Sequence, residues 1–384
     1  MYSCVMLNND YIAGRPAVYS RVCFSSIAEM FFKYSENAVA SYIALDEKTD
    51  DTISKSEISN DESDSIFVFS GAFPFCTADT LDEIYNHHVK SGNKLTALSC
   101  KDEETGDFVP IGIFLCDKSI LKDFIDFDEK MLQVMDNGTD TELYEVNSIN
   151  SMCVSDCLSL ADASNAAHDI VCFKLMQNDV MMINPESIFV SWFAEIAPGV
   201  TIMPNTIIKG ESKIGTGSVI GPNTQITDCT IGENVTVNSS VLVESVVKDG
   251  ANIGPFAYIR PNSSIGNNVK IGDFVEIKNA SIDDGTKVAH LTYVGDADVG
   301  KRVNFGCGTV LVNYDGTKKY RSKICDDVFI GCNTNLVSPV TVHRGAFIAA
   351  GSTITDDIPD NSLAIARARQ INKTGWKKKW EEKK

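Results

Sequence analysis

The stretch that decides the fold is residues 253–278, which read IGPFAYIRPNSSIGNNVKIGDFVEIK. An isoleucine stands at every sixth position of this stretch, at Ile253, Ile259, Ile265, Ile271 and Ile277. An α-helix has an apolar period of about 3.6 residues and a strand a period of about two, so neither explains the pattern alone. A six-residue repeat is typical of a parallel β-helix, in which successive repeats form the faces of a coil.

The same period continues on both sides of this stretch. It runs from Ile196 to Ile226 and returns from Ile324 to Ile354. Glycine directly follows several of the apolar positions, as it does at Gly254 and Gly272. We therefore predict a parallel β-helix over residues 190–360.

One segment between the repeats breaks the period. Residues 308–323 read GTVLVNYDGTKKYRSK, a polar and basic run that contains an Asp315-Gly316 turn signal. Solenoid proteins loop such insertions out, often on the binding face. The residues alone leave two interpretations open, a surface loop without a role and a part of a binding site.

The first half of the chain has the pattern of a mixed α/β domain. Ile66–Ser70, Lys94–Ser99 and Ile111–Cys116 have the composition of strands, and Ala78–Lys90 has a helical pattern that Thr77 would cap. Alternating strands and helices favour a parallel, Rossmann-like sheet with helices on its faces.

The domain boundaries follow from these patterns. We predict an α/β domain at 1–150, a connecting helix and linker at 151–189 with the helix at 151–167, and a lysine-rich tail at 361–384. The acidic, serine-rich stretch Asp46–Ser65 is expected to be a mobile loop.

Composition excludes several classes of protein. The formal net charge of −18 argues against a nucleic-acid binder, which needs a basic face. The 12 cysteines form no CxxC pair, so we expect reduced thiols and no zinc site. No apolar run approaches the ~18 residues of a membrane span, and residues 1–10 lack the features of a signal peptide. These features predict a cytoplasmic protein.

Spacing within the repeat brings charged residues together. If three six-residue faces make a coil of about 18 residues, Arg260 and Lys278 stack on consecutive coils about 4.8 Å apart, as do Tyr258 and Glu276. Like charges at that spacing are unfavourable, and an anion such as a phosphate would relieve the repulsion. The alternative is two solvated surface cations.

His290 is the histidine of the repeat region that lies near this cationic pair. It is flanked by apolar residues in the run AHLTY, residues 289–293. A neutral imidazole can act as general base toward an amine near pH 7. The alternative is a structural histidine.

Six motifs in this order resemble the acetyltransferase half of the bacterial bifunctional GlmU family, over residues 254–376. They are GPFAYIRP at 254–261, GDFVEIK at 272–278, HLTYVGDA at 290–297, NFGCGT at 304–309, NYDG at 313–316 and AIAR at 364–367. Members of that family acetylate glucosamine-1-phosphate and couple the product to UTP. The resemblance implies a left-handed β-helix, acetyl-CoA as substrate and a homotrimer.

The resemblance also implies roles for individual residues. His290 would be the general base, and the sugar phosphate would be held by Arg260, Lys278, Tyr293, Asn304 and Lys319. Acetyl-CoA would contact Cys307, Asn313, Tyr314, Cys332, Ala350 and Arg367, with the backbone N–H of Cys307 stabilising the oxyanion. Cys307 and Cys332 replace the family's usual alanine and serine.

The first half resembles the family's uridyltransferase domain less closely. Gly71–Pro74 matches a Gly-Asp-x-Pro motif, but Ala72 replaces the metal-binding aspartate, whereas Asn150 of the second metal-binding segment is retained. Pro110 stands in place of a sugar-binding asparagine, and only Ala13–Pro16 matches near the nucleotide loop. We expect a shortened nucleotidyltransferase-like domain that binds no metal and lacks uridyltransferase activity.

The predicted function is therefore acetyl transfer from acetyl-CoA to the amine of glucosamine-1-phosphate, in UDP-N-acetylglucosamine biosynthesis. Two alternatives stay open. One is a bifunctional enzyme that keeps a Mg²⁺-dependent uridyltransferase activity, and the other is a non-catalytic β-helix scaffold. Neither nucleic acid nor a membrane is an expected partner.

Overall fold

A computed structural model of the chain describes residues 64–69, 71–76, 78–102, 104–117 and 140–376, together with strand segments between residues 2 and 45. The chain divides into two compact units. One contains Met1–Lys174 and Val190–Phe193, and the other contains Leu175–Phe189 and Ala194–Lys384. The predicted boundaries at residues 150, 189 and 360 stay predictions.

The first unit contains a six-stranded sheet in the order β10-β8-β9-β7-β1-β6. Its strands are β1 Tyr2–Leu7, β6 Val39–Leu45, β7 Ser65–Phe69, β8 Leu95–Lys101, β9 Phe108–Asp117 and β10 Thr141–Glu145. Two small pairs are β2 Tyr11–Ile12 with β3 Arg15–Pro16, and β4 Arg21–Val22 with β5 Ser25–Ser26. The predicted α/β class is confirmed.

The predicted parallel sheet contains one antiparallel strand. β1 runs parallel to β6 and β7, and β10 runs parallel to β8, but β9 is antiparallel to both β7 and β8. The reason is the short connection after β8, where Asp102 N–H donates to the carbonyl of Asp107 at 2.8 Å. A parallel crossover needs about a dozen residues or more, so this turn makes a hairpin.

The predicted helices are both present, one of them shifted along the chain. Helix α3 spans Ala78–Ser91, as expected, and Thr77 lies outside the described residues. Helix α6 spans Cys157–Gln177, so the prediction of 151–167 was wrong at both ends. Asp156 sets the start, because its carboxylate accepts the N–H of Ser159 at 2.8 Å and satisfies a first-turn donor.

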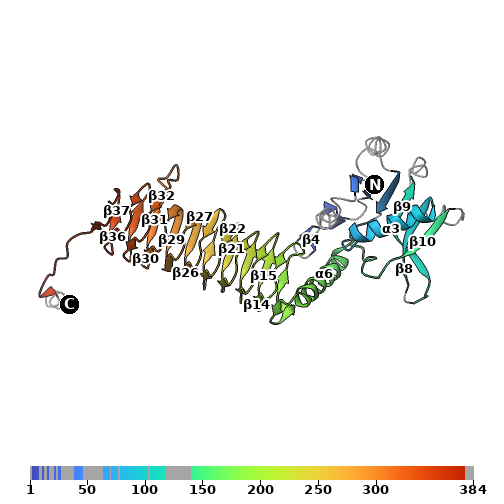
Figure 1. The fold of residues 1–384 in the computed structure, drawn as a ribbon, viewed down its shortest axis with the longest axis horizontal. Helices are drawn as coiled ribbons and strands as arrows, with labels where there is room; N and C mark the ends of the chain where they lie inside the picture. The colour runs from blue at the N-terminus through green and yellow to red at the C-terminus, as the bar shows by residue number, and fades with distance from the viewer. Residues whose placement is uncertain are drawn as a thin grey trace, which may run out of the picture. The chain divides into compact units, whose positions relative to one another are not determined.

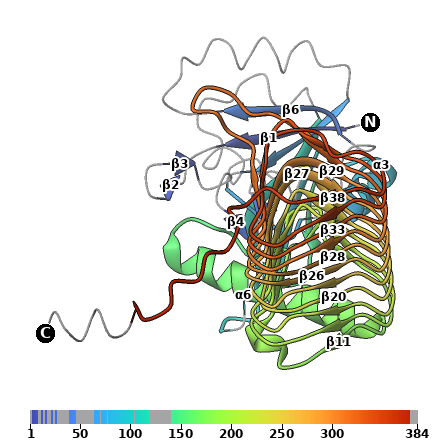
Figure 2. The same cartoon turned by 90° about the vertical axis from the view of Figure 1, so that its left-hand side faces the viewer.

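The second unit is a parallel β-helix whose coils stack from β11 to β38 (Figures 1 and 2). An 11-stranded sheet forms one face. Its strands are β11 Met181–Met182, β14 Thr201–Ile202, β17 Val219–Ile220, β20 Thr236–Val237, β23 Asn252–Ile253, β26 Lys270–Asp273, β28 Lys287–His290, β30 Asn304–Phe305, β33 Phe329–Ile330, β36 Phe347–Ile348 and β38 Leu363–Ala364.

A 17-stranded sheet forms the other two faces. Its strands are β12 Phe189–Val190, β13 Glu195–Ile196, β15 Ile207–Lys209, β16 Lys213–Ile214, β18 Gln225–Thr227, β19 Thr230–Ile231, β21 Val241–Val243, β22 Ser245–Val247, β24 Tyr258–Ile259, β25 Ser263–Ile265, β27 Glu276–Ile282, β29 Tyr293–Val299, β31 Val310–Val312, β32 Ser322–Ile324, β34 Asn335–Val337, β35 Thr341–Val342 and β37 Thr353–Ile354. A 3-10 helix, Pro185–Ser187, precedes β12.

The six-residue period fills the interior of the coils, so the predicted β-helix is confirmed. Ile253 pairs with Ile271, and Ile259 pairs with Ile277, all with no exposed surface. Full burial of one such side chain contributes about 1.5–3 kcal/mol relative to exposure. A column of stacked isoleucines therefore fixes the register of each coil on the next.

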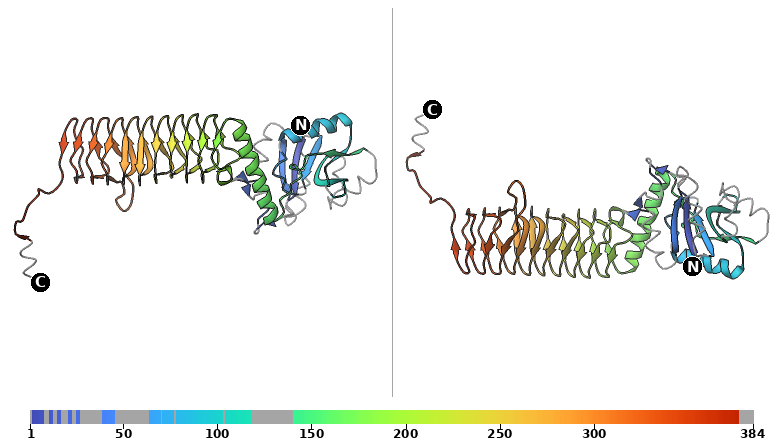
Figure 3. Two further views of the ribbon diagram at one scale, coloured as in Figure 1. Left: turned by 90° about the horizontal axis from the view of Figure 1, so that it is seen from below. Right: turned by 90° about the horizontal axis from the view of Figure 1, so that it is seen from above.

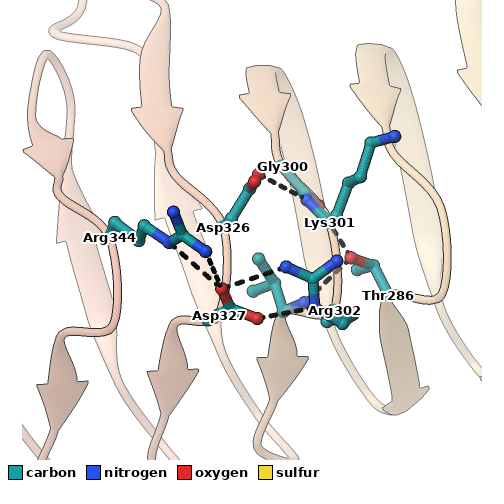
Figure 4. Close-up of polar contacts among 8 residues, drawn as sticks. Thr286, Gly300, Lys301, Arg302, Asp326, Asp327 and Arg344 are labelled. Atoms are coloured by element: carbon teal, nitrogen blue, oxygen red, sulfur yellow. Dashed lines mark hydrogen bonds and ion pairs between the residues drawn. The ribbon is translucent and has the colours of Figure 1, made fainter.

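The coils are not all of one length. Glu195 pairs with Lys213, which is the spacing expected of three full repeats, whereas Gln225 pairs with Val241, short of that spacing. Asn304 pairs with Phe329, well beyond three repeats, because the insertion lies between them. Side chains at the turns also tie coils together, as where Asp327 lies between the guanidinium groups of Arg302 and Arg344 (Figure 4).

Within the described part of the chain, no helix combines the length and hydrophobicity needed to cross a bilayer.

Candidate active site

The predicted stacking of Arg260 on Lys278 is confirmed by the strand register. Tyr258 pairs with Glu276, and the next residues pair in step, so Arg260 and Lys278 leave β24 and β27 at the same place on consecutive coils. Nη1 of Arg260 donates to Oε1 of Glu276 at 2.7 Å. Its guanidinium also lies 5.7 Å from the ring centre of Tyr258, which fixes its direction.

A third cation completes this group, which we call the cation cluster (Arg260, Lys278 and Lys319). Lys319 faces Lys278, and it is the main cause that lowers the pKa of Lys278, with Arg260 adding to the effect. Mutual repulsion of this kind disfavours the protonated form. An anion bound among the three side chains would remove the repulsion, as a phosphate does.

Lys319 belongs to the insertion, which is shorter than the sequence suggested. Strands β31 and β32 keep the repeat up to Val312 and from Ser322, so only residues 313–321 loop out of the stack (Figure 3). Asp315 organises the loop by accepting the N–H groups of Thr317 and Lys318, both at 2.8 Å. These bonds hold the pKa of the Asp315 carboxyl far below its usual range.

Arg321 anchors the end of the insertion to the coils. Its Nε and Nη2 both bond the carboxylate of Asp298, with Nε at 2.8 Å from Oδ2. Its Nη1 also donates to the carbonyl of Asn279 at 2.8 Å. A planar guanidinium held in this way is rigid, so the loop has a defined position on the coils.

Asn313 and Tyr293 belong to one hydrogen-bond network, in which Asn313 and Asp296 are buried. Nδ2 of Asn313 donates to Oδ2 of Asp296 at 2.5 Å and lies 3.4 Å from the Tyr293 hydroxyl. The other oxygen of Asp296 accepts from Asn279 at 2.5 Å. Neither Asp296 nor Asn279 was predicted from the sequence. Both have positive φ angles, 49° and 46°, and they lie at the same turn of successive coils. Tyr314 lies farther out, with its hydroxyl donating to the carbonyl of Gly316 at 2.6 Å.

His290 lies at the end of β28, at the turn where the chain enters the face that β29 begins. Its side chain is 57% exposed, which disfavours a purely structural role in the core. Its Nδ1 lies 2.5 Å from Oδ1 of Asp273. The six-residue period alone does not bring Asp273 against His290.

Residues predicted to contact acetyl-CoA occupy this same turn on the next coils. Cys307, Cys332 and Ala350 each precede a turn residue with positive φ, as His290 does before Leu291. These coils approach closely, since a Cβ on Gly306 would lie 2.4 Å from the Cys332 nitrogen and one on Gly331 would lie 2.4 Å from the Ala350 nitrogen.

Arg367 lies beside this column, and Asn304 lies on the strand that leads to Cys307. A Cβ on Gly351, next to Ala350, would be 3.8 Å from Cδ of Arg367. Asn304 begins β30 and pairs with Lys287 on the preceding coil.

One chain thus presents two separate groups. The first group is the turn column (His290, Cys307, Cys332 and Ala350), which lies where the chain enters the face that β29 begins. The second is the cation cluster, which lies where that face ends, before the turn at Asn279. A depression of about 620 Å³ shares no lining residue with either group. Three aspartates line it, of which Asp298 is already paired with Arg321, and we assign the depression no ligand.

The first unit offers no complete Mg²⁺ site at the two family positions. Ala72 is buried and its methyl group has no oxygen to donate. Asn150 is also buried, and its amide donates to the hydroxyl of Thr80 at 3.3 Å. Ala72 therefore supplies no ligand for a divalent cation, whereas Asn150 retains an amide oxygen, and Ala13 and Gly14 lie outside the described residues.

Comparisons with known proteins agree with the repeat. The family model "Bacterial transferase hexapeptide (six repeats)" matches residues 193–228, 244–279 and 321–356. The chain is 36% identical over 366 residues to the bifunctional protein GlmU of Clostridium beijerinckii, covering 83% of this chain and 79% of that one. It is 48% identical over 243 residues to the GlmU protein of Shouchella clausii, covering 63% and 54% of the two chains.

Proposed function

Because the chain belongs to the bifunctional GlmU family, a family of transferases with a left-handed β-helix, we propose that it acetylates glucosamine-1-phosphate. The acetyl donor is acetyl-CoA, and the product, N-acetylglucosamine-1-phosphate, enters UDP-N-acetylglucosamine biosynthesis. The single observation that carries the proposal is the turn column, in which His290 is followed on successive coils by Cys307, Cys332 and Ala350.

The cation cluster binds the phosphate of the substrate. Arg260 and Lys278 on the coils and Lys319 on the insertion contribute three positive charges to one place. Tyr293 and Asn304 contribute a hydroxyl and an amide toward the sugar. Each charge-assisted hydrogen bond to a phosphate contributes about 1.5–3 kcal/mol, so the cluster favours a phosphorylated amino sugar over a free one.

His290 takes the proton as the substrate amine attacks the thioester carbonyl of acetyl-CoA. The carbon–nitrogen bond forms, and the carbonyl oxygen becomes an oxyanion that accepts the backbone N–H of Cys307. Collapse of this intermediate breaks the carbon–sulfur bond and releases CoA. General base catalysis of this kind contributes about 100- to 10,000-fold in rate.

Acetyl-CoA lies along the turn column. Cys332, Ala350 and Arg367 line its path, and Asn313 and Tyr314 approach it from the insertion. Cys307 acts through its backbone, so its thiol is compatible with the role. The exposed thiol of Cys332 provides a weaker hydrogen-bond donor to CoA than a hydroxyl would.

The working assembly is a homotrimer in the cytoplasm, where acetyl-CoA is available. The two groups lie at opposite edges of one face, so a neighbouring chain is needed to bring a cation cluster and insertion against a turn column. Within one chain the site is incomplete.

Uridyltransferase activity is lost in this proposal. The supporting observation is Ala72, whose side chain cannot bind the Mg²⁺ that the nucleotide phosphates require. A bifunctional enzyme is the alternative, and UTP-dependent pyrophosphate release from N-acetylglucosamine-1-phosphate and Mg²⁺ distinguishes the two. We expect none, and any release that exceeds the enzyme-free rate contradicts the loss.

A panel of acceptors tests the acetyl transfer. The purified chain is incubated with acetyl-CoA and glucosamine-1-phosphate, glucosamine-6-phosphate or glucosamine, and acetylated products are identified by mass spectrometry. We expect kcat/KM to be highest for glucosamine-1-phosphate, by about 100-fold over glucosamine. Equal use of the three acceptors, or no acetylated product, contradicts the proposed substrate.

A further inference from the structure

Asp273 lies directly against His290 on the neighbouring coil. The two residues pair in the strand register of β26 and β28, and Oδ1 of Asp273 lies 2.5 Å from Nδ1 of His290. Both side chains leave the coils at the same turn, and the carboxylate is 36% exposed. The aspartate is thus a neighbour of the proposed base that the proposed mechanism does not use.

The backbone holds this pair in place. The N–H of Leu291, next to His290, donates to the carbonyl of Asp273 at 3.0 Å. Gly272 lets the coils approach so closely that a Cβ there would lie 1.9 Å from the carbonyl oxygen of Ala289. Phe274 stacks on Phe256 of the preceding coil, with ring centres 5.4 Å apart. These contacts hold the backbone on either side of Asp273, so the carboxylate projects from a fixed position on the coil.

The contact selects one form of the neutral imidazole. A carboxylate can only accept, so Nδ1 must carry the hydrogen and Nε2 is left with its lone pair. An aspartate is already ionised near pH 7, and the hydrogen bond with His290 is the main cause that lowers the pKa of the Asp273 carboxyl further.

We propose that Asp273 is the positioning residue of the active site, which holds His290 in the tautomer whose Nε2 can take a proton from the substrate amine. The part of this inference that concerns catalysis rests on the proposed acetyl transfer. The part that concerns the tautomer rests on geometry alone. The carboxylate also stabilises the imidazolium that forms when the amine loses its proton.

The first test is kinetic. Asp273→Ala removes the acceptor, and we expect kcat to fall by about 10- to 100-fold, a part of the contribution of a general base, with little change in KM for either substrate. Asp273→Asn keeps an oxygen that accepts from Nδ1, so its loss is smaller. Asp249→Ala is the matched control, because Asp249 also lies at a turn and accepts the N–H of Glu233 at 2.8 Å without touching a histidine.

The second test reads the tautomer without any activity. The chain has five histidines, so side-chain 15N NMR of labelled protein, with His290→Gln for assignment, reports which nitrogen of His290 carries the hydrogen. We expect Nδ1–H in the wild type, in Asp273→Asn and in Asp249→Ala, and a mixture of tautomers in Asp273→Ala.

The outcomes separate the two proposals. Suppose that neither the wild type nor any variant acetylates an amino sugar, but the tautomer of His290 shifts in Asp273→Ala. The proposed acetyl transfer is then rejected, and the positioning role stands. If the tautomer is unchanged in Asp273→Ala, or wild-type His290 carries Nε2–H, the positioning role is overturned. If Asp273→Ala does not fold, Asp273→Asn decides: a kcat loss equal to that of His290→Ala overturns the role, since the amide should retain the tautomer.

Discussion

At the scale of the residue, the cation cluster shows how a repeat becomes a binding site. Stacked isoleucines fix the register, and the register places Arg260 beside Lys278 whether or not the two charges repel each other. The burial of the isoleucines supplies about 1.5–3 kcal/mol for each side chain, more than the repulsion between partly exposed cations costs. The fold can therefore hold a charge arrangement that a bound phosphate then stabilises.

The first prediction concerns the pH dependence of phosphate binding. Lys319 and Arg260 lower the pKa of Lys278 below its ordinary value of 10.5, and a bound phosphate raises it again. Binding therefore takes up protons, and affinity falls as the pH rises through the lowered pKa toward 10.5. Calorimetric titration with N-acetylglucosamine-1-phosphate, which has no amine to titrate, measures this uptake in alkaline buffers of different ionisation enthalpy.

The matching variant is Lys278→Gln. We expect it to weaken binding by about 10- to 100-fold and to abolish the proton uptake. Lys323→Gln, a lysine of β32 outside the cluster, is the control and should bind as the wild type does. Unaltered proton uptake in Lys278→Gln would mean that another group is titrated.

At the scale of the element, the insertion depends on its anchor. Arg321 is held by two bonds to Asp298 and by the backbone carbonyls of Asn279 and Ala297, and it ends the loop that carries Lys319. We predict that Arg321→Ala raises KM for glucosamine-1-phosphate by about 10-fold while leaving the coils folded. Faster hydrogen exchange of the amides of residues 314–320, measured by mass spectrometry, should accompany the change.

The control for this prediction is Arg302→Ala. Arg302 makes a comparable two-bond pair with Asp327, at a turn that carries no insertion (Figure 4). It should leave both KM and loop exchange unchanged. If Arg321→Ala behaves like Arg302→Ala, the anchor has no role in holding the loop.

The sequence predicted which strands form better than it predicted which residues pair between consecutive coils. The six-residue period predicts the β-helix and the stacking of Arg260 on Lys278, because the coil that joins them has the length of three full repeats. The coil that ends at His290 is shorter, so Asp273 pairs with His290, whereas three full repeats would have placed it against Leu291. The residue that pairs with the proposed base thus depends on the length of one turn, and the six-residue period does not predict that length.

The errors in the first unit have the same physical origin. A tight turn at Asp102 made β9 antiparallel, and a cap at Asp156 moved the start of α6. Both depend on a single side-chain or backbone bond at a turn. The expected mobile loop at Asp46–Ser65 and the lysines at 377–379 lie largely outside the described residues and stay predictions.

At the scale of the whole molecule, the proposed active site requires more than one chain. The turn column and the cation cluster lie at opposite edges of one face, so we predict that inactive chains complement each other. His290→Ala and Tyr314→Ala proteins are unfolded together, refolded as a mixture and assayed. In mixed trimers some sites receive His290 from one variant and Tyr314 from the other, and activity should return to a fraction of the wild-type value.

Each variant refolded alone is the control, and its activity should be no higher than it was before unfolding. Mixtures that are no more active than the sum of the two controls would contradict a shared site. Sedimentation of the same samples should show that the mixture forms the same assembly as the wild type.

The most direct test of the central claim is the rate of CoA release with acetyl-CoA and glucosamine-1-phosphate, for the wild type and His290→Ala under the same conditions. We predict release that depends on the amino sugar phosphate, and a fall in kcat of about 100-fold or more in His290→Ala with KM values little changed. Wild-type turnover in His290→Ala, or no sugar-dependent release from the wild type, would contradict it.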